Sequence, residues 1–184
     1  MKIIKELYGS KIHLRKLKEN DVGQSYLRWM NDKDLLQYME SRYQNYTILD
    51  LKDYVFNVDK DKSAILWGIF ENANQRHVGN IKLGSIQWIH KTGDIGILVG
   101  ERDVWGRGYA TQAIELASAY AFSKLKLNKI TAGIYSENKG SEAAFIKAGF
   151  QREGLLKSQY IYKDNTMDKI LMGIENPSLH SKNI

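Results

Sequence analysis

The sequence predicts a mixed α/β fold, of the α+β kind, built as one domain. Three observations support this prediction. Two segments with helical spacing come early, a block of strand-like segments follows, and a strand then leads through a glycine-rich turn into an alanine-rich helix. The chain has 184 residues, 43% of them hydrophobic, which suffices for one compact core. The expected order of elements is βααββ(β)βαβαββ.

The chain is expected to begin with a strand and a helix. Residues 12–17 alternate apolar and charged side chains, as a half-buried strand does. Asn20 or Asp21 then offers a cap for a helix over residues 22–30.

A second helix and three strands follow. Thr47 is expected to cap a helix that ends near Val58, with Leu49, Tyr54 and Val55 among its apolar positions. The strands are expected at residues 64–71, 78–89 and 95–99, where Ile, Leu, Val and Trp are frequent.

The second half of the chain is expected to alternate helices and strands. From Ala110 onward, alanines at helical spacing predict a long helix. Three elements follow: a strand at 129–135, a short helix at 141–147 closed by Gly149, and a hairpin of 151–162 with 169–174. We expect one domain over residues 1–176 and a flexible tail over residues 177–184.

Composition excludes several classes of protein. The chain has no cysteine, so disulfides, a thiolate nucleophile and zinc–thiolate sites are unavailable, and no metal is expected. No run of about 18 apolar residues occurs, and we therefore expect a soluble, cytoplasmic protein without a membrane partner. The net charge of +6 is spread along the chain without a nucleic-acid-binding motif, so nucleic acid is not an expected partner.

The stretch that carries chemistry lies between the strand at 95–99 and the alanine-rich helix. Gly106 and Gly108 let the backbone approach a ligand closely, and the start of a helix presents unpaired N–H donors. These donors and the positive end of the helix dipole suit a pyrophosphate. Arg102 and Arg107 add full charges at the same place.

Two other nucleotide-binding patterns fit poorly. A Walker loop requires Gly-Lys-Ser/Thr, but Gly108 is followed by Tyr109 and Ala110. A dinucleotide-binding loop requires a third glycine where Thr111 stands, and an acid about 20 residues later, where this sequence has none.

Residues 105–111, Asn138 and residues 148–150 occur in an order that resembles the GNAT superfamily of N-acetyltransferases. The chain is most similar to the branch that includes ribosomal-protein N-terminal acetyltransferases and spermidine acetyltransferases. The resemblance extends from Ile12 to about Ile174. It implies a splayed central sheet with helices on both faces, and acetyl-CoA bound in the cleft.

The resemblance also implies the residues that bind acetyl-CoA. They are Ile97, Leu98, Val99, Arg102, Trp105, Gly106, Arg107, Gly108, Tyr109, Ala110, Asn138 and Phe145. The strand would pair with the pantetheine arm through its main chain, the loop would bind the phosphates, and the Asn138 side chain would hold the arm. Where the family usually has Gln or Arg, three residues before the first glycine, this chain has Asp103. Which side chain assists the phosphates is therefore open.

The catalytic residues depart from the family pattern. Attack of a neutral amine on a thioester requires a route for the amine proton, an oxyanion donor and often an acid for the thiolate. Many relatives carry a tyrosine as that acid where this chain has Phe145, which has no proton to donate. Ser141 and Tyr135 are candidate replacements, water is a third, and no general base is assigned.

Three residues are candidates for binding the acceptor. Glu40 and Arg42 lie in the polar stretch between the first two helices, where the family often forms its acceptor pocket, and Glu40 suits a cationic amine. A solvated loop is the alternative. His90 precedes the strand at 95–99 and is a candidate proton relay, with a plain surface role as its alternative.

The sequence therefore predicts an N-acetyltransferase that transfers acetyl directly from acetyl-CoA to a primary amine. The acceptor is expected to be an amino sugar on a nucleotide carrier or a protein N-terminus, thus a small molecule or a peptide. A polyamine ranks third, because a positively charged protein attracts polycations poorly. A catalytically weak acetyl-CoA-binding module is the competing class. Dimers are common among similar proteins, which leaves a homodimer open.

Overall fold

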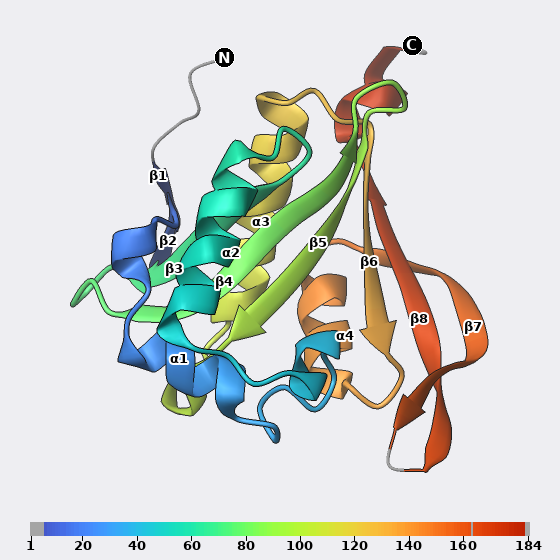
Figure 1. Ribbon diagram of the computed structural model, residues 1–184. Coiled ribbons are helices and arrows are strands. Elements are labelled where there is room, and N and C mark those ends of the chain that lie inside the picture. Colours follow the sequence, from blue (N-terminus) through green and yellow to red (C-terminus); the bar gives the residue numbers. More distant parts are fainter. Residues whose placement is uncertain (1–5, 163, 183–184) are drawn as a thin grey trace.

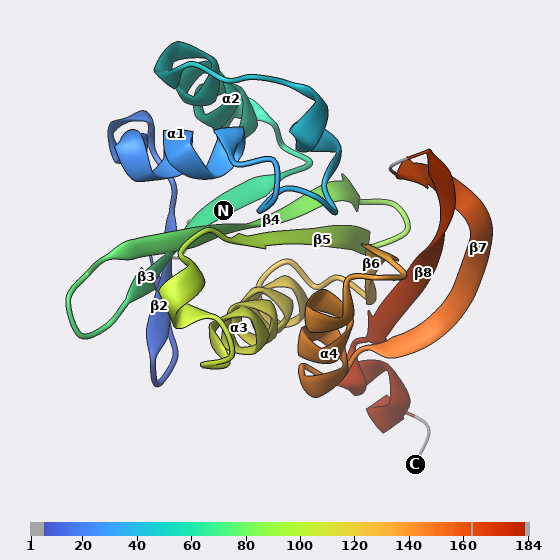
Figure 2. The same cartoon turned by 90° about the horizontal axis from the view of Figure 1, so that it is seen from below.

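The structure is a computed structural model and describes residues 6–162 and 164–182. Its centre is an eight-stranded sheet with the strand order β1-β2-β3-β4-β5-β6-β8-β7. Helices α1 and α2 cover one face of this sheet, and α3 and α4 cover the other (Figures 1 and 2). The predicted mixed sheet with helices on both faces is confirmed.

The strands and helices lie close to their predicted positions. The strands are β1 (Glu6–Tyr8), β2 (Ile12–Lys16), β3 (Ile65–Glu71), β4 (His77–Gln87), β5 (Thr92–Val99), β6 (Lys129–Tyr135), β7 (Gln151–Tyr162) and β8 (Asn165–Glu175). The helices are α1 (Gln24–Asn31), α2 (Ile48–Lys60), α3 (Tyr109–Ser123) and α4 (Lys139–Lys147). Short 3-10 turns are formed by Glu19–Asp21, Glu40–Tyr43, Arg102–Val104 and Pro177–Lys182. The sequence pattern did not indicate β1.

The sheet opens between β5 and β6. These two strands are parallel, whereas the other neighbouring strands are antiparallel. They pair only where residues 92–94 meet residues 129–131, and they then separate (Figure 1). Residues 95–99 of β5 therefore face a gap in the sheet on the β6 side.

The sheet has a core on each face, and its last strand forms an exposed edge. Ile114 and Ala117 of α3 pack on one face, and Trp29 of α1 and Leu51 of α2 pack on the other. Strand β7 pairs only with β8, and most of its residues are exposed. The curled β7–β8 hairpin projects from the sheet toward the side on which α1 and α2 lie (Figure 2).

Helix α1 begins later than predicted. Its N-cap is Gly23, not Asn20 or Asp21. The Asp21 carboxylate instead accepts the Lys18 amide at 2.8 Å and the Arg15 guanidinium at 2.9 and 3.0 Å. These bonds close the preceding 3-10 turn, because a short acidic side chain readily accepts from nearby backbone donors. The predicted cap is thus wrong, although the helix exists.

Helix α2 begins as predicted. The Asp50 amide donates to the Thr47 hydroxyl at 3.2 Å, and the Thr47 amide donates to the Asp50 carboxylate at 2.7 Å. This reciprocal pair is a capping box. Of the expected apolar positions, only Val55 is buried, since Leu49 is 70% exposed and Tyr54 39%.

The chain continues past β8 in a short turn. Asn176 is buried, and its side-chain amide donates to the Leu127 carbonyl at 2.9 Å. Pro177–Lys182 then forms a 3-10 turn, while residues 183–184 lie outside the described residues. Flexibility of this tail stays a prediction.

Two kinds of feature are not found in the described residues. Within residues 6–162 and 164–182, no helix combines the length and hydropathy needed to span a membrane. The same residues contain no group of three or more His, Asp or Glu side chains that could bind a metal ion.

Candidate active site

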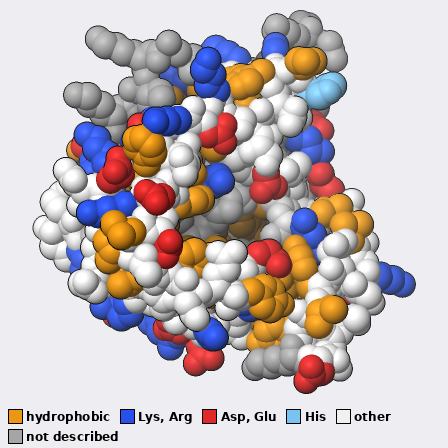
Figure 3. All heavy atoms as spheres, in the orientation of Figure 1, with side chains coloured by type: hydrophobic (Ala, Val, Ile, Leu, Met, Phe, Trp, Pro, Cys, Tyr) orange, Lys and Arg blue, Asp and Glu red, His pale blue; other side chains and the backbone are white. Residues whose placement is uncertain are grey.

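A cavity of about 670 Å³ lies where β5 and β6 separate. Four parts of the chain line it: β5, the glycine loop (residues 100–108) with the start of α3, the start of α4, and the α1–α2 connection (residues 32–46). The space-filling view shows a hollow near its centre, where the two strands separate (Figure 3). Sites for small molecules commonly measure about 300–1,000 Å³. The cavity is therefore the candidate active site.

Most of the residues predicted to bind the cofactor line this cavity. They are Ile97, Leu98, Val99, Trp105, Gly106, Gly108, Tyr109, Ala110 and Asn138. Ser141, one of the two catalytic candidates, lines it as well. The structure thus brings together a strand edge, a loop, a helix start and α4 from separate parts of the chain.

The glycine loop requires its glycines. Gly106 and Gly108 have φ angles of 75° and 83°, which side chains other than glycine adopt only with strain. Around Gly106 no atom lies within 4 Å of the position that a Cβ would occupy. Gly108 is the N-cap of α3 and has no side chain to act as acceptor, so the N–H groups of the first helical turn remain as donors at the cavity wall.

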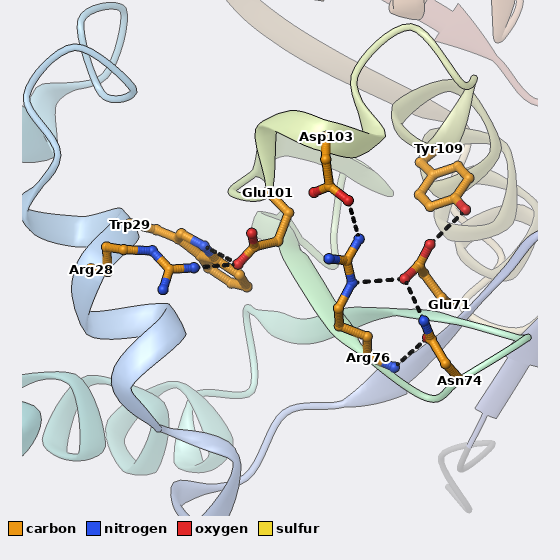
Figure 4. Close-up of polar contacts among 8 residues, drawn as sticks. All are labelled: Arg28, Trp29, Glu71, Asn74, Arg76, Glu101, Asp103 and Tyr109. Carbon is orange, nitrogen blue, oxygen red and sulfur yellow. Dashed lines mark hydrogen bonds and ion pairs between the residues drawn. The ribbon is translucent and has the colours of Figure 1, made fainter.

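The hairpin between β3 and β4 fixes the loop from outside (Figure 4). The Glu71 carboxylate accepts the Tyr109 hydroxyl at 2.9 Å, Arg76 Nε at 2.8 Å and the Asn74 amide at 3.1 Å. Arg76 Nη2 also donates to Asp103 at 2.7 Å. Burial raises the pKa of Glu71, but these hydrogen bonds outweigh it and lower that pKa below its ordinary value. One charged cluster thus holds the middle of the loop, at Asp103, and the residue that follows its end, Tyr109.

Asp103 belongs to this cluster. The Arg76 guanidinium lowers the pKa of its carboxyl below the ordinary value. The Asp103 carboxylate is thus an anchor for the loop. No sequence pattern indicated this contact, because Arg76 and Asp103 are 27 positions apart.

Helix α1 holds the beginning of the loop. The Glu101 carboxylate accepts Trp29 Nε1 at 3.0 Å and also the Arg28 guanidinium (Figure 4). Arg102 Nη2 donates to both oxygens of Asp32, at 2.9 and 3.1 Å. Arg102 lines a smaller cleft beside α1 and does not line the cavity. The expected contact of Arg102 with the cofactor is therefore not supported by its position.

Two other predicted cofactor residues also lie off the cavity wall. The Arg107 side chain is exposed, and its carbonyl accepts Lys11 Nζ at 2.9 Å. Phe145 is only 2% exposed and packs against Phe150, with the ring centroids 4.9 Å apart. Phe145 is a core residue, because this side of α4 faces the sheet.

Asn138 both starts α4 and faces the cavity. Its side-chain oxygen accepts the Ser141 amide at 3.1 Å, which caps the helix. The cap uses the oxygen alone, and among the described residues no acceptor meets the side-chain nitrogen. One asparagine can thus cap the helix and donate a hydrogen bond to a ligand.

The structure brings Tyr135, Glu40 and Arg42 together. The Tyr135 hydroxyl donates to the Glu40 carboxylate and accepts Arg42 Nη1 at 2.9 Å. Burial, followed by the bond to Glu40, raises the pKa of Tyr135 to about 12, although Arg42 opposes this. Tyr135 does not line the cavity, whereas Ser141 does. Ser141 is therefore better placed to donate a proton there.

Tyr135 belongs to a tyrosine cluster (Tyr38, Tyr43, Tyr135, Tyr160 and Tyr162), and Glu40 and Arg42 bond to it. Tyr135 stacks on Tyr160 with centroids 3.7 Å apart, and Tyr38 contacts both Tyr135 and Tyr162. Tyr38 also lines the cavity. Sequence reasoning missed Tyr38, Tyr160 and Tyr162, because no local motif joins residues from the α1–α2 connection, β6 and β7.

Arg42 connects the α1–α2 connection to β7. Its guanidinium donates to the Met39 carbonyl at 3.0 Å and to the Ile161 carbonyl at 3.2 Å. It lies 4.2 Å from the Tyr43 ring centroid and 5.2 Å from that of Tyr135. The predicted substrate residue is thus largely occupied in joining parts of the chain.

His90 is not part of the site. It is exposed in the turn between β4 and β5, at the end of β5 opposite to Val99 (Figure 1). The position of His90 does not support the predicted contact with the substrate, because residues 92–96 of the extended strand separate the turn from Ile97, where the cavity wall begins.

Comparisons with known proteins agree with this geometry. A family model described as "Acetyltransferase (GNAT) domain" matches residues 11–151. The N-acetyltransferase YoaA of Bacillus subtilis, named as uncharacterized, is 28% identical over 165 residues, which are 87% of this chain and 90% of YoaA. Spermidine N(1)-acetyltransferase of Vibrio cholerae is 25% identical over 165 residues, with the same two shares.

Solved structures share the fold. Spermidine N-acetyltransferase from Vibrio cholerae, solved with CoA and spermine, has a TM-score of 0.81 at 21% identity, covering 91% of this chain and 97% of that one. RimL, a ribosomal alpha-N-protein acetyltransferase solved with CoA, has a TM-score of 0.83 at 16% identity, covering 92% and 97%. At such identities the likeness establishes the fold.

Proposed function

Because the chain belongs to the GNAT family of acetyltransferases, we propose that its cavity binds acetyl-CoA and that the acetyl group passes directly to a primary amine. The family assigns the chain to the N-acetyltransferases, and the two relatives described above are named as N-acetyltransferases too. What remains to be proposed is which residues bind the two substrates and which amine is acetylated.

One observation carries the assignment of the cofactor site. The N-terminus of α3 and residues 97–99 of β5, which have no β6 partner, line the same cavity. The first offers N–H donors and partial positive charge for a pyrophosphate. The second offers main-chain groups for an amide-containing arm such as pantetheine, and the side-chain nitrogen of Asn138 adds a donor. Gly106, with open space at its Cβ position, lets a phosphate approach the backbone.

The chain's own residues then serve the transfer. Acetyl-CoA supplies the activated thioester, at which the C–N bond forms and the C–S bond breaks. The departing thiolate needs a proton, and the attacking amine must lose one. We assign the first task to Ser141, whose position on the cavity wall supports it better than that of Tyr135.

The acceptor is proposed to be an amino sugar or a protein N-terminus, with a polyamine as the alternative. The alternative gains support from the similarity to spermidine acetyltransferases. Glu40 is exposed and bonds to Tyr135 but is not among the residues that line the cavity, so we propose that it attracts the acceptor's ammonium group before the amine enters.

Calorimetry of acetyl-CoA binding tests the proposal. Gly108→Trp should weaken binding at least about 100-fold, because the indole both strains the loop and fills the phosphate site. Gly23→Trp is the matched control, since no atom lies within 4 Å of its Cβ position and Gly23 does not line the cavity. A folded wild type that binds no acetyl-CoA would refute the proposal.

A second assay separates an enzyme from a binding module. Thiol release from acetyl-CoA is measured with an amino sugar nucleotide, an N-terminal peptide and spermidine. Turnover with any of these amines supports catalysis. Tight binding without turnover on all three would favour the binding module.

A further inference from the structure

Arg102 of the glycine loop pairs with Asp32, an acid that does not belong to the charged cluster of Glu71, Arg76 and Asp103. It lines a cleft of about 310 Å³ beside α1, together with Asp32 and Glu101, and none of the residues of this cleft line the main cavity. A phosphate in the cavity would therefore have to draw Arg102 away from Asp32. This position calls for another role.

Asp32 joins two segments through one carboxylate. Its oxygens accept Arg102 Nη2 at 2.9 and 3.1 Å, and one of them also accepts the Leu35 amide at 2.9 Å. Asp32 is the C-cap of α1, and the Leu35 bond starts the next turn. The glycine loop is thus tied to the first residues of the α1–α2 connection.

The α1–α2 connection is closed on itself. The Asn31 side chain accepts the Tyr46 amide at 2.8 Å and donates to the Tyr46 carbonyl at 2.9 Å. Compact surface loops whose ends lie close together are packed by their own side chains. We therefore expect a change at Asp32 to affect the packing of the rest of this loop.

This closed loop forms one wall of the cavity. Leu35, Gln37, Tyr38 and Met39 line the cavity from it. Its far side is joined to β7, where the Tyr162 hydroxyl donates to Gln37 at 2.9 Å and the Tyr43 hydroxyl donates to the Ile161 carbonyl at 3.1 Å. The wall is held by β7 on one side and by Arg102 on the other.

We propose that Arg102 is a positioning residue that, through Asp32, sets the acceptor-side wall of the cavity against the glycine loop, and that it is not a phosphate ligand. The role of the wall rests on the function proposed above. Glu101 supports the same arrangement, because it binds Arg28 and Trp29 of α1 next to Asp32. Two consecutive loop residues thus fix the end of α1 from which the wall begins.

Hydrogen exchange and calorimetry test this role together. Arg102→Ala and Asp32→Ala should each raise amide exchange over residues 33–46 by at least about threefold, while the affinity for CoA changes by less than about threefold. Both variants should fold, because the pair is exposed, at 53% and 34% for its two side chains. Asp32→Asn, which keeps an acceptor for the Leu35 amide, separates the ion pair from the turn.

Arg76→Ala is the matched control. It breaks the ion pair to Asp103 on the same loop and leaves Asp32 untouched. Exchange over residues 33–46 should stay at the wild-type level in this variant. Once an acceptor is known, Arg102→Ala should raise the KM for that acceptor more than the KM for acetyl-CoA.

Two results would overturn the proposal. If Arg102→Ala weakens CoA binding tenfold or more while Asp32→Ala tightens it, Arg102 is a phosphate ligand restrained by Asp32. Unchanged exchange over residues 33–46 in both alanine variants would show that the pair does not hold the wall. The exchange measurement needs no ligand, so it stands even if the wild type fails to bind CoA.

Discussion

The glycine loop and the tyrosine cluster meet the same cavity but are built in opposite ways. The glycine loop presents main-chain groups, and charged side chains hold it from behind, with Glu71 and Arg76 on one side and Asp32 on the other. The tyrosine cluster consists of side chains, joined by ring contacts and by Arg42. One region offers its backbone to a ligand, and the other offers its side chains.

This difference separates what can vary from what cannot. Main-chain groups are present whatever the side chains are, so the loop depends on backbone conformation and on glycine. A wall of side chains changes its chemistry with each substitution. We therefore expect the loop side to tolerate few changes at its glycines and the cluster to set the choice of acceptor.

The largest effect is expected when Phe145, in the core on the cofactor side of the cavity, is replaced by tyrosine. If α4 contributes only packing at this position, Phe145→Tyr places a hydroxyl in the core and costs about 2 kcal/mol of unfolding free energy, with no gain in turnover. Urea unfolding and kcat measure the two effects. Ile146→Tyr, at a neighbouring position that is 54% exposed, is the control. A higher kcat for Phe145→Tyr would show that the ring reaches the reaction.

Asn138 tests whether cap and ligand donor can be separated. Asn138→Asp keeps an oxygen for the Ser141 amide but loses the donor nitrogen, so acetyl-CoA affinity should fall about tenfold at nearly unchanged stability. Asn138→Ala should lose the affinity and also about 1 kcal/mol of stability. Calorimetry and thermal unfolding measure both. Equal affinity of the wild type and the Asp variant would contradict the donor role.

The pH dependence of the unfolding free energy tests the packing of His77, the first residue of β4. His77 is packed between Phe70 and Trp29, with ring centroids at 4.8 and 5.0 Å, and burial lowers its pKa below 6.5. The neutral form is thus favoured in the fold. Its contribution to the free energy of unfolding is complete above about pH 6.5 and is lost as the pH falls toward the lowered pKa.

His77→Gln should flatten this part of the stability profile. Urea unfolding between about pH 7.5 and about pH 5 compares the two proteins. A wild-type profile as flat as that of the variant would mean that His77 accepts a proton without cost.

The smallest effect is expected at Tyr135. If its hydroxyl serves Glu40 and Arg42 and not the thiolate, Tyr135→Phe should lower kcat by less than about threefold, because the ring stacking on Tyr160 remains. Steady-state kinetics with a saturating acceptor measures this. A loss of 100-fold or more would instead make Tyr135 the acid and remove that task from Ser141.

The glycine loop could be predicted from sequence because its determinants are local. Gly106, Gly108 and the start of α3 lie within a few residues of one another, and each has its own conformational signature. The cap at Thr47 could be predicted for the same reason. Where the determinant was a competing local bond, as at Asp21, the prediction failed.

The residues that hold the glycine loop, and the contacts within the tyrosine cluster, could not be predicted from the sequence. Arg76 meets Asp103 because a hairpin folds over the loop, and Tyr135 meets Arg42 across 93 positions. Such contacts follow from strand register and from the curl of β7, which a single sequence does not encode in any short pattern. The distance of His90 from the cavity could not be foreseen either, because residues that are close in sequence lie far apart along an extended strand.

The edge position of β7 has a consequence for how such a molecule can diversify. This strand carries Tyr160 and Tyr162, and its pairing partner in the sheet is β8 alone. Most residues of β7 are exposed, and none belongs to the hydrophobic core on which α3 packs. If β7 sets the choice of acceptor, as proposed, we expect that exchanging the β7–β8 hairpin, by selection or by grafting, changes the preferred amine and leaves the acetyl-CoA site intact.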